Sequence, residues 1–178
     1  MTSYCYLKHP LITKLLLIAN PTKLLGIYFA DSKHTPAIQS DWKLNPQQPI
    51  LEAGAKEIED YLGGKRTKFS IPLHFKGTEF QCKVWEQLRA IPYGETISYS
   101  ELAKRAGNPR AVRAVGSANG KNPFCVVVPC HRVIAKDGTI GGYAGGLARK
   151  RHLLAMENSN LPRQYFKKKI RVEPLQHS

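Results

Sequence analysis

The sequence predicts two domains, a small α/β domain followed by a mainly helical one, and three observations lead to this prediction. Apolar runs at strand spacing and one amphipathic helix occupy the first part of the chain. Segments with helix-capping signals then follow in quick succession. A chain of 178 residues is long enough for two small domains with real cores. We therefore expect an N-terminal domain at 1–77, a second domain at 78–160 and a basic tail at 161–178.

The N-terminal domain is predicted from two apolar runs, one helix and one alternating segment. Residues 15–19 and 24–30 are apolar runs on either side of the turn-forming residues 20–23, which is typical of a hairpin. After a polar loop, Pro49 opens a helix that a Gly-Gly pair closes. Residues 68–75 alternate between apolar and polar side chains, which predicts a half-buried strand.

The second domain is predicted from its helix caps. Thr78 and Ser98 each begin a capping-box pattern, in which two side chains satisfy the first N–H groups of a helix. An Asn-Pro pair caps a third helix, with Arg110 and Arg113 in its first turns. Two short helices joined by a Gly-containing turn have the form of a helix-turn-helix, a motif that enters the major groove of DNA.

The charge of the chain favours a polyanionic partner. Lys and Arg number 27 against 13 Asp and Glu, a formal net charge of +14, and residues 101–178 carry +11 of it. Each Lys or Arg that neutralises a phosphate releases a counterion, so a positive half attracts nucleic acid. A basic surface that serves solubility alone would give the same composition.

The cysteines point to a reducing compartment, because they are too few for a disulfide framework and form no C-x-x-C pair. The apolar run at residues 11–19 is short and interrupted by Lys14, which favours a strand over a signal-peptide core. No segment approaches the roughly 18 apolar residues of a membrane span. The cysteines are Cys5, Cys82, Cys125 and Cys130.

Cys130 is the candidate reactive residue. It follows the apolar run 124–128, predicted to be a buried strand or extended segment, and His131 and Arg132 come next. Cationic neighbours lower a cysteine pKa from about 8.5, and the thiolate is the reactive form. The other cysteines lie in apolar surroundings or lack a partner group nearby, which is typical of inert thiols. Neighbours on an extended segment point to opposite faces, so adjacency does not establish a His–Cys hydrogen bond.

The segment Pro129-Cys130-His131-Arg132-Val133 resembles the active-site signature of the O6-alkylguanine-DNA alkyltransferases. Further motifs resemble the same family in order and spacing across residues 78–157, and such a series is far more specific than one motif. These motifs are Tyr93-Gly94 through Ser98-Tyr99, Ala106-Gly107-Asn108-Pro109, Arg113-Ala114-Val115-Gly116, Asn122-Pro123, Gly141-Gly142-Tyr143-Ala144-Gly145-Gly146-Leu147 and Leu153-Leu154-Ala155-Met156-Glu157.

The resemblance implies DNA repair by a single-turnover methylated-DNA–[protein]-cysteine S-methyltransferase. An alkyl group, typically methyl, would pass from O6-alkylguanine in double-stranded DNA to Cys130 and inactivate the protein. O4-alkylthymine stays open as a second substrate. The alkylated nucleotide would be flipped out of the duplex, because its target atom is unreachable in the stack. The implied fold is a ribonuclease-H-like sheet with a helix, then a winged-helix-like helix-turn-helix.

Family roles can be placed on matching positions of this chain. By resemblance, Cys130 is the nucleophile, His131 takes its proton through a bridging water, and Glu157 orients His131, as in catalytic triads. Tyr99 would give a proton to the departing guanine, which is a poor leaving group as an anion. Asn122 matches the asparagine that braces the site against the helix-turn-helix.

Further positions match the DNA and base contacts of the family. Arg113 matches the arginine that fills the gap left by the flipped base. Ala144 stands where some members have a serine, so backbone amides would hold O6 here. The implied DNA contacts are Arg110, Arg113, Tyr99, Ala114 and Gly116, and the implied pocket residues are Pro129, Val133, Tyr143 and Ala144.

The resemblance also leads to expectations about metal binding, partners and location. Some members hold zinc in the N-terminal domain, but structural zinc usually takes four Cys or His ligands. One cysteine precedes Cys82 here, so we expect no metal, and the family needs no cofactor. We expect a monomer without membrane contact, located in the cytoplasm, or in the nucleus of a eukaryote.

Three other functions are compatible with parts of the sequence. A damage-flagging relative would share the helix-turn-helix and lack the cysteine, whereas Cys130 is present. A transcriptional regulator would read bases, but the third helix is rich in Ala and Gly and offers few side chains for this. A thiol hydrolase would use Cys, His and Glu for an acyl intermediate and turn over repeatedly.

Overall fold

The computed structural model describes residues 1–159, and within them the contacts divide into two compact units. Unit 1 comprises Met1–Lys76 and the later segment Pro123–Val127. Unit 2 comprises Gly77–Asn122 and the described chain from Val128 onward. The basic tail predicted at 161–178 lies outside the described residues.

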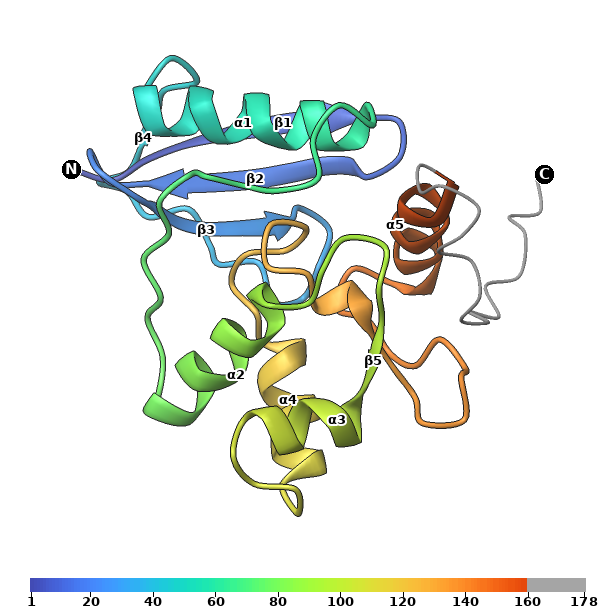
Figure 1. Cartoon of the computed structure of the whole chain (residues 1–178). Helices are drawn as coiled ribbons and strands as arrows, with labels where there is room; N and C mark the ends of the chain where they lie inside the picture. The colour runs from blue at the N-terminus through green and yellow to red at the C-terminus, as the bar shows by residue number, and fades with distance from the viewer. Residues whose placement is uncertain (160–178) are drawn as a thin grey trace. The chain divides into compact units, whose positions relative to one another are not determined.

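Unit 1, in its described part, is built on a four-stranded sheet in the order β3-β2-β1-β4 (Figure 1). β1 (Ser3–His9), β2 (Thr13–Ala19) and β3 (Leu24–Phe29) are antiparallel neighbours, and β4 (Lys43–Leu44) pairs in parallel with β1. The predicted hairpin is confirmed. Its turn is held by Asn20, whose Oδ1 accepts hydrogen bonds from the N–H groups of residues 22 and 23 at 2.9 and 2.8 Å.

The first strand, β1, has a weak sequence signal and was not expected. Cys5 and Leu7 are buried, whereas Tyr6 and Lys8 are exposed, so the apolar set is short. β1 forms because it pairs residue for residue with the strongly apolar β2 over its whole length. Its partner therefore determines this strand more than its own composition does.

The predicted helix is α1 (Pro49–Leu62), which runs along the sheet of unit 1 (Figure 1). Pro49 takes the first helical position, and the side chain of Gln48 accepts a hydrogen bond from the N–H of Leu51 at 2.9 Å. Gly54 lets the helix approach the sheet, because a Cβ there would lie 3.2 Å from a methyl carbon of Leu24.

The strand predicted at 68–75 is wrong. The segment is extended, but its backbone pairs with β3 at the bridge between Leu73 and Leu24 rather than along its length. The N–H groups of residues 70 and 71 donate to the carboxylate of Glu57 on α1, at 3.1–3.2 Å. A side chain therefore takes the place of a neighbouring strand, and the predicted alternation in burial is kept.

Unit 2 begins with the helices α2 (Glu79–Arg89), α3 (Tyr99–Arg105) and α4 (Val112–Gly120), which pack on one another (Figure 1). Thr78 caps α2 with a full capping box, as predicted. At the start of α3 the Oγ of Ser98 accepts the N–H three residues later at 3.0 Å. Both predicted helix starts are confirmed.

The third predicted helix starts later than expected, at Val112. A turn precedes it, in which Asn108 Oδ1 accepts a hydrogen bond from the N–H of Arg110 at 3.1 Å. Pro109 takes the second position of this turn, which suits its fixed φ, rather than the first position of the helix. The placement of Arg110 in the helix is therefore wrong, whereas Arg113 lies in the first turn as predicted.

The segment Pro123–Val127 belongs to unit 1 although it follows α4. Ile27 of β3 donates to its first carbonyl at 2.8 Å and accepts from the N–H of Cys125 at 3.0 Å. Val126 then has φ 73°, and the N–H of Val127 donates to the carbonyl of Cys125 at 2.9 Å. This is a γ-turn of the strained, positive-φ kind. The run is buried as predicted, but a turn replaces the expected strand.

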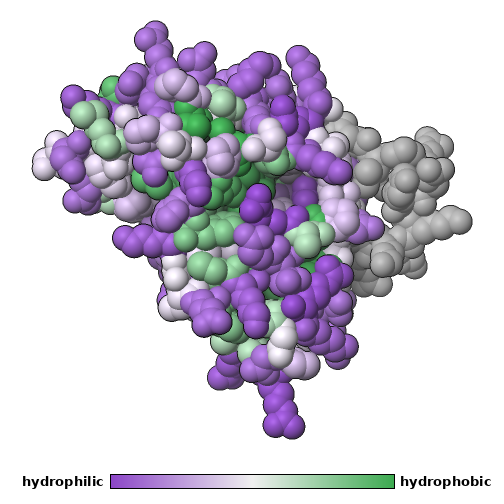
Figure 2. Space-filling view, turned by 60° about the vertical axis from the view of Figure 1, so that its left-hand side comes forward, coloured by the Kyte–Doolittle hydropathy of each residue, from purple (hydrophilic) through white to green (hydrophobic). Residues whose placement is uncertain are grey.

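The remainder of unit 2 comprises η1 (Cys130–Arg132), β6 (Val133–Ile134) and α5 (Leu147–Ser159). β6 pairs in parallel with β5 (Ile97–Ser98). Hydrophilic side chains cover much of the face shown in Figure 2, as expected of a chain with this many charges. Among residues 1–159, no helix is long and apolar enough to cross a membrane.

Candidate active site

Cys130 is the first residue of the 3-10 helix η1, and 2% of its surface is exposed. Its N–H donates to the carbonyl of Val128 at 2.8 Å across Pro129, which has φ −81° and ψ 63°. This is an inverse γ-turn, so the main chain turns tightly just before the thiol. Cys130 therefore lies just beyond the buried run 124–128, as predicted, at the point where the chain turns into η1.

The surroundings of Cys130 act on its thiol in two directions. Burial raises the pKa of Cys130 and is the largest effect. A hydrogen bond with the side chain of Asn122, the positive charge of Lys150 and backbone hydrogen bonds at the start of η1 lower it. The thiol is thus protonated at rest, while groups that stabilise a thiolate already surround it.

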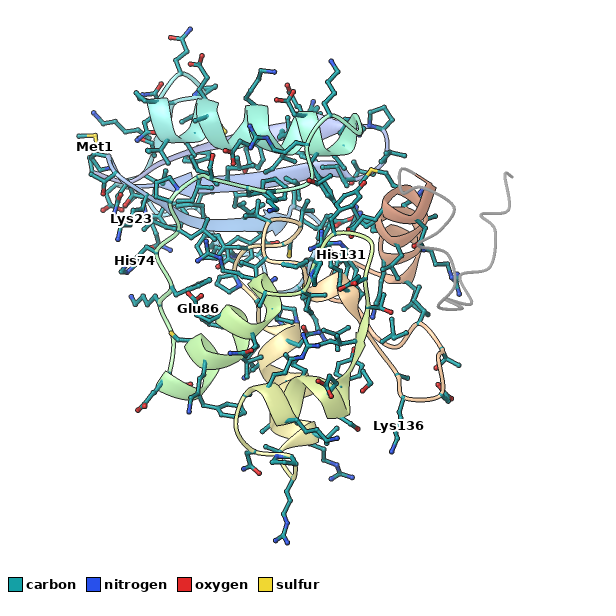
Figure 3. The ribbon with its side chains drawn as sticks, viewed as in Figure 1. Met1, Lys23, His74, Glu86, His131 and Lys136 are labelled. Atoms are coloured by element: carbon teal, nitrogen blue, oxygen red, sulfur yellow. The ribbon has the colours of Figure 1, made fainter. Side chains whose placement is uncertain are left out.

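His131 and Glu157 form a buried pair within unit 2. His131 Nε2 on η1 lies 2.6 Å from Glu157 Oε2 on α5, and the two side chains are 0% and 1% exposed. In Figure 3, His131 lies among other side chains, whereas Lys136 projects outward. Burial lowers the pKa of His131 more than Glu157 raises it, so the imidazole is neutral. Because Nε2 faces the carboxylate, Nδ1 is the nitrogen that can accept a proton.

Arg132 is the next donor to the same carboxylate. Its Nε lies 2.6 Å from Glu157 Oε1, and the N–H of Gly94 donates to that oxygen at 3.2 Å. Burial would raise the pKa of Glu157, but His131 and Arg132 lower it to about 2. The sequence predicted Arg132 as a cation near the thiol, and its pairing with a residue far along the chain has no sequence signal.

Lys150 on α5 is fully buried and was missed in the sequence. Its Nζ donates to the carbonyl oxygens of Val133 at 2.7 Å and Gly142 at 2.9 Å. Burial lowers the pKa of Lys150 to about 8, an effect that the thiolate form of Cys130 opposes. Lys150 lies in a run of three basic residues, which is typical of a solvated surface, so composition conceals its burial.

Tyr99, the first residue of α3, reaches the loop that follows β6. Its hydroxyl donates to the carbonyl of Gly142 at 3.4 Å. Burial raises the pKa of Tyr99, and so does the thiolate form of Cys130, so the phenol stays protonated. Gly141 has φ 70°, and a Cβ there would lie 3.2 Å from the Tyr99 ring, so glycine is needed on both counts.

Asn122 lies after the end of α4 and is 5% exposed. Its Nδ2 donates to the carbonyl of Val128 at 2.8 Å, two residues before the thiol. Together with its hydrogen bond to Cys130, this contact ties the end of α4 to the approach to η1. The structure thus brings Asn122, Tyr99 and Cys130, which were predicted as site residues, into one part of unit 2.

The other predicted residues lie in two further parts of unit 2. Pro129 and Val133 are buried on either side of η1, whereas Tyr143 and Ala144 are half-buried in the loop before α5. Apart from Tyr99 on α3, the predicted DNA contacts lie on the turn before α4 and on α4 itself. Of these, Arg110, Arg113 and Ala114 are exposed and Gly116 is half-buried.

The remaining cysteines have surroundings of a different kind. Cys5 and Cys125 are buried and Cys82 is partly exposed. Burial raises the pKa of Cys5 to about 11, which keeps that thiol unreactive. In the part of the chain that the structure describes, no group of three or more His, Cys, Asp or Glu side chains could hold a metal ion.

The fold and site define a class of protein with a buried cysteine, a buried His–Glu pair beside it and an exposed basic helix pair. Profiles of the 6-O-methylguanine DNA methyltransferase family match the chain twice. The profile described as the ribonuclease-like domain matches residues 3–75, and that of the DNA binding domain matches residues 79–159. The chain belongs to this family, and it has the family's two domains, an N-terminal sheet domain and a helical C-terminal domain.

Individual relatives agree with the family. A methylated-DNA–protein-cysteine methyltransferase of Mycolicibacterium paratuberculosis is 45% identical over 139 residues, 78% of this chain and 82% of the relative. One of Methanosarcina barkeri is 43% identical over 150 residues, 84% of this chain and 94% of the relative. A crystal structure of Mycobacterium tuberculosis OGT in complex with DNA has a TM-score of 0.82 and 38% identity, and covers 90% of this chain and 96% of that one.

Proposed function

We propose that this chain repairs DNA by moving the alkyl group of O6-alkylguanine onto Cys130, once per molecule. The observation that carries the proposal is the buried Cys130 thiol, with Asn122 and Lys150 beside it. The next residue in the chain, His131, forms a buried pair with Glu157. Relatives named methylated-DNA–protein-cysteine methyltransferases support the reaction, and the OGT complex with DNA supports the partner.

The reaction is a displacement at the alkyl carbon. His131 accepts the thiol proton at Nδ1 through a bridging water, and Glu157 stabilises the imidazolium that forms. The Cys130 sulfur forms a bond to the alkyl carbon as the bond from that carbon to O6 breaks, and the electron pair of that bond stays on guanine. Tyr99 donates a proton to the departing guanine, and solvent exchange returns the His131 proton to the phenolate. The thioether product has no easy route back to a thiol.

The DNA would be bound through the helix-turn-helix. The alkylated base leaves the stack, because its target carbon is otherwise out of reach, and the exposed Arg113 fills the gap. Arg110 would contact the DNA directly. The small residues Ala114 and Gly116 would let α4 approach the DNA backbone closely. Tyr143 and Ala144 would form the wall of the base pocket together with Pro129 and Val133. O4-alkylthymine is a substrate if this pocket accepts a pyrimidine.

The finer fold features and the setting belong to the same proposal. We assign a ribonuclease-H-like architecture to the N-terminal domain at 1–77 and a winged-helix form to the domain at 78–160. The ribonuclease-like description of the first profile and the β5–β6 pair beside α3 support these assignments. The protein acts as a monomer in the compartment that holds its DNA, the cytoplasm or, in a eukaryote, the nucleus.

The test is transfer of a labelled methyl group from an O6-methylguanine duplex, followed by digestion and identification of the labelled peptide. We expect label on the Cys130 peptide of the natural chain and of Cys125→Ser, the matched control, and none on Cys130→Ser. Cys130→Ser should still bind the duplex. Absence of label from every cysteine of the natural chain would refute the proposal. Repeated ester hydrolysis would favour a thiol hydrolase, and preference for one undamaged sequence would favour a regulator.

A further inference from the structure

The carboxylate of Glu157 is shared between a base and a permanent cation. His131 Nε2 lies 2.6 Å from Oε2, and Arg132 Nε lies 2.6 Å from Oε1 and 3.3 Å from Oε2. The Arg132 side chain is 7% exposed and that of Glu157 is 1% exposed. Solvent therefore screens this ion pair little.

Arg132 is itself fixed from a second side. Its Nη1 donates to the carbonyl of Ile91 at 2.7 Å, and its guanidinium lies 5.7 Å from the centre of the Tyr93 ring. A guanidinium stays charged at every pH at which the protein is folded, and its planar donors fix the direction of each bond. Glu157 thus has a positive partner that holds its position and never titrates.

This arrangement changes what Glu157 does to His131. A buried imidazole facing a carboxylate alone tends to hold a proton, because each charge stabilises the other. Arg132 opposes this twice, since it competes for the carboxylate and repels an imidazolium. A protonated His131 cannot accept the proton of Cys130, so the charge on the imidazole decides whether the thiol can be activated.

We propose that Arg132 is a positioning residue that holds Glu157 in place and keeps His131 unprotonated, ready to accept the Cys130 proton. This inference rests on the proposed alkyl transfer, since it gives His131 the role of base. It goes beyond the family roles because it assigns a function to the arginine that follows the Cys-His pair.

Within residues 1–159, the charged and titratable groups that act on His131 or adjoin it include members of two elements. On η1 they are Cys130 and Arg132, and on α5 they are Lys150 and Glu157. Burial lowers the pKa of His131, Glu157 raises it, and Arg132 and then Lys150 lower it. Removal of the Arg132 charge should therefore raise the pKa of His131.

The experiment measures the His131 pKa directly, by NMR of protein with isotope-labelled histidine, and then the pH dependence of methyl transfer from duplex DNA. His131→Gln assigns the resonance, and circular dichroism confirms folding. Arg132→Gln removes the charge, Arg132→Lys keeps it, and Arg89→Gln removes a charge from an exposed ion pair with Glu86. The NMR titration is independent of activity, so a chain that transfers no methyl group would refute the proposed function and leave this test intact.

We expect Arg132→Gln to raise the His131 pKa by about one pH unit. The acid limb of the pH–rate profile should move to higher pH by the same amount. The rate should fall about tenfold on the acid side and little on the alkaline plateau. Arg132→Lys and Arg89→Gln should keep the natural pKa. An unchanged pKa in folded Arg132→Gln would overturn the proposal. If that variant does not fold, a shift of about one unit in folded Arg132→Lys would overturn it instead, because the charge is kept.

Discussion

The ammonium group of Lys150 lies 2.9 Å from the carbonyl oxygen of Gly142, and the same oxygen accepts the hydroxyl of Tyr99 at 3.4 Å. A buried cation therefore joins α5 to the loop that follows β6, at the point where that loop meets the proposed proton donor. Lys150 also acts on the thiol, since its charge lowers the pKa of Cys130. A single side chain thus influences both the Cys130 thiol and the loop beside it.

Lys150→Met should weaken both effects. Loss of the nearby charge should lower the rate of Cys130 alkylation by iodoacetamide about tenfold near neutral pH, because less thiolate forms. The carbonyls of Val133 and Gly142 lose a donor, which costs about 1–3 kcal/mol for each buried group left unsatisfied. Amide exchange in residues 139–146 should become faster. Lys136→Met, on the exposed part of the same loop, is the control, and equal rates in both variants would contradict the assigned role.

The positive φ of Val126 predicts an unusual order of stability. Val126→Ala and Val126→Gly both remove a fully buried side chain, so both should be less stable than the natural chain. Glycine adopts φ 73° without strain, whereas alanine does not. The free energy of unfolding of Val126→Gly should therefore exceed that of Val126→Ala by about 1 kcal/mol. Urea unfolding measures the difference. The matching substitutions at the buried Val127 are the control, and there the alanine variant should be more stable than the glycine variant. If the alanine variant were also the more stable one at Val126, the positive φ would store no strain.

Stability should fall steeply in acid. The pKa of Glu157 is lowered from 4.5 to about 2, so its contribution is complete above about pH 4.5 and is lost as the pH falls towards 2. His131 has a lowered pKa, so unfolding takes up a proton below pH 6.5, which acts in the same direction. The loss from Glu157 is on the order of 3 kcal/mol.

Urea unfolding of the natural chain between pH 7 and pH 2.5 measures this loss. Asp60→Asn is the control, since Asp60 is an acidic residue of α1 whose ion pair with Lys56 lies at the surface, and it should leave the acid profile almost unchanged. A natural chain whose stability stays flat over this range would contradict the buried His131–Glu157 pair.

Arg113→Ala tests the proposed gap-filling role. Repair of an O6-methylguanine duplex should slow markedly, because the flipped state loses the side chain that replaces the base. Reaction with the free base O6-methylguanine should change little, since nothing has to be flipped. The comparison of both rates with those of Lys56→Ala, an exposed cation of α1, separates this role from loss of charge. Equal losses on duplex and free base would argue against flipping by Arg113.

The local elements were predictable where the chain carries its own start and stop signals. α1 follows from Pro49 and its closing glycines, and α2 from the capping box at Thr78, because these residues satisfy helix ends with neighbours in the sequence. β1 was missed because its partner strand stabilises it. The strand at 68–75 was wrongly predicted because Glu57, on another element, binds its N–H groups.

The candidate site also contains residues that the sequence indicated and residues that it did not. The Pro-Cys-His-Arg segment marks Cys130 and His131, and the family resemblance added Glu157, Tyr99 and Asn122. Sequence patterns concealed Lys150, since a lysine between two arginines is usually solvated, yet tertiary packing buries it completely. Contacts such as Arg132 with Glu157 arise from packing of distant segments, which no local pattern encodes.

The stoichiometry of methyl transfer distinguishes a single transfer to Cys130 from catalytic turnover. The protein is mixed with an excess of O6-methylguanine duplex and followed by intact-mass and peptide mass spectrometry until the reaction stops. We predict a plateau at one methyl group per chain, all of it on Cys130, with Cys5, Cys82 and Cys125 unmodified. Continued turnover of the duplex beyond one equivalent, or a plateau with the methyl group on another cysteine, would show that Cys130 is not a single-use acceptor.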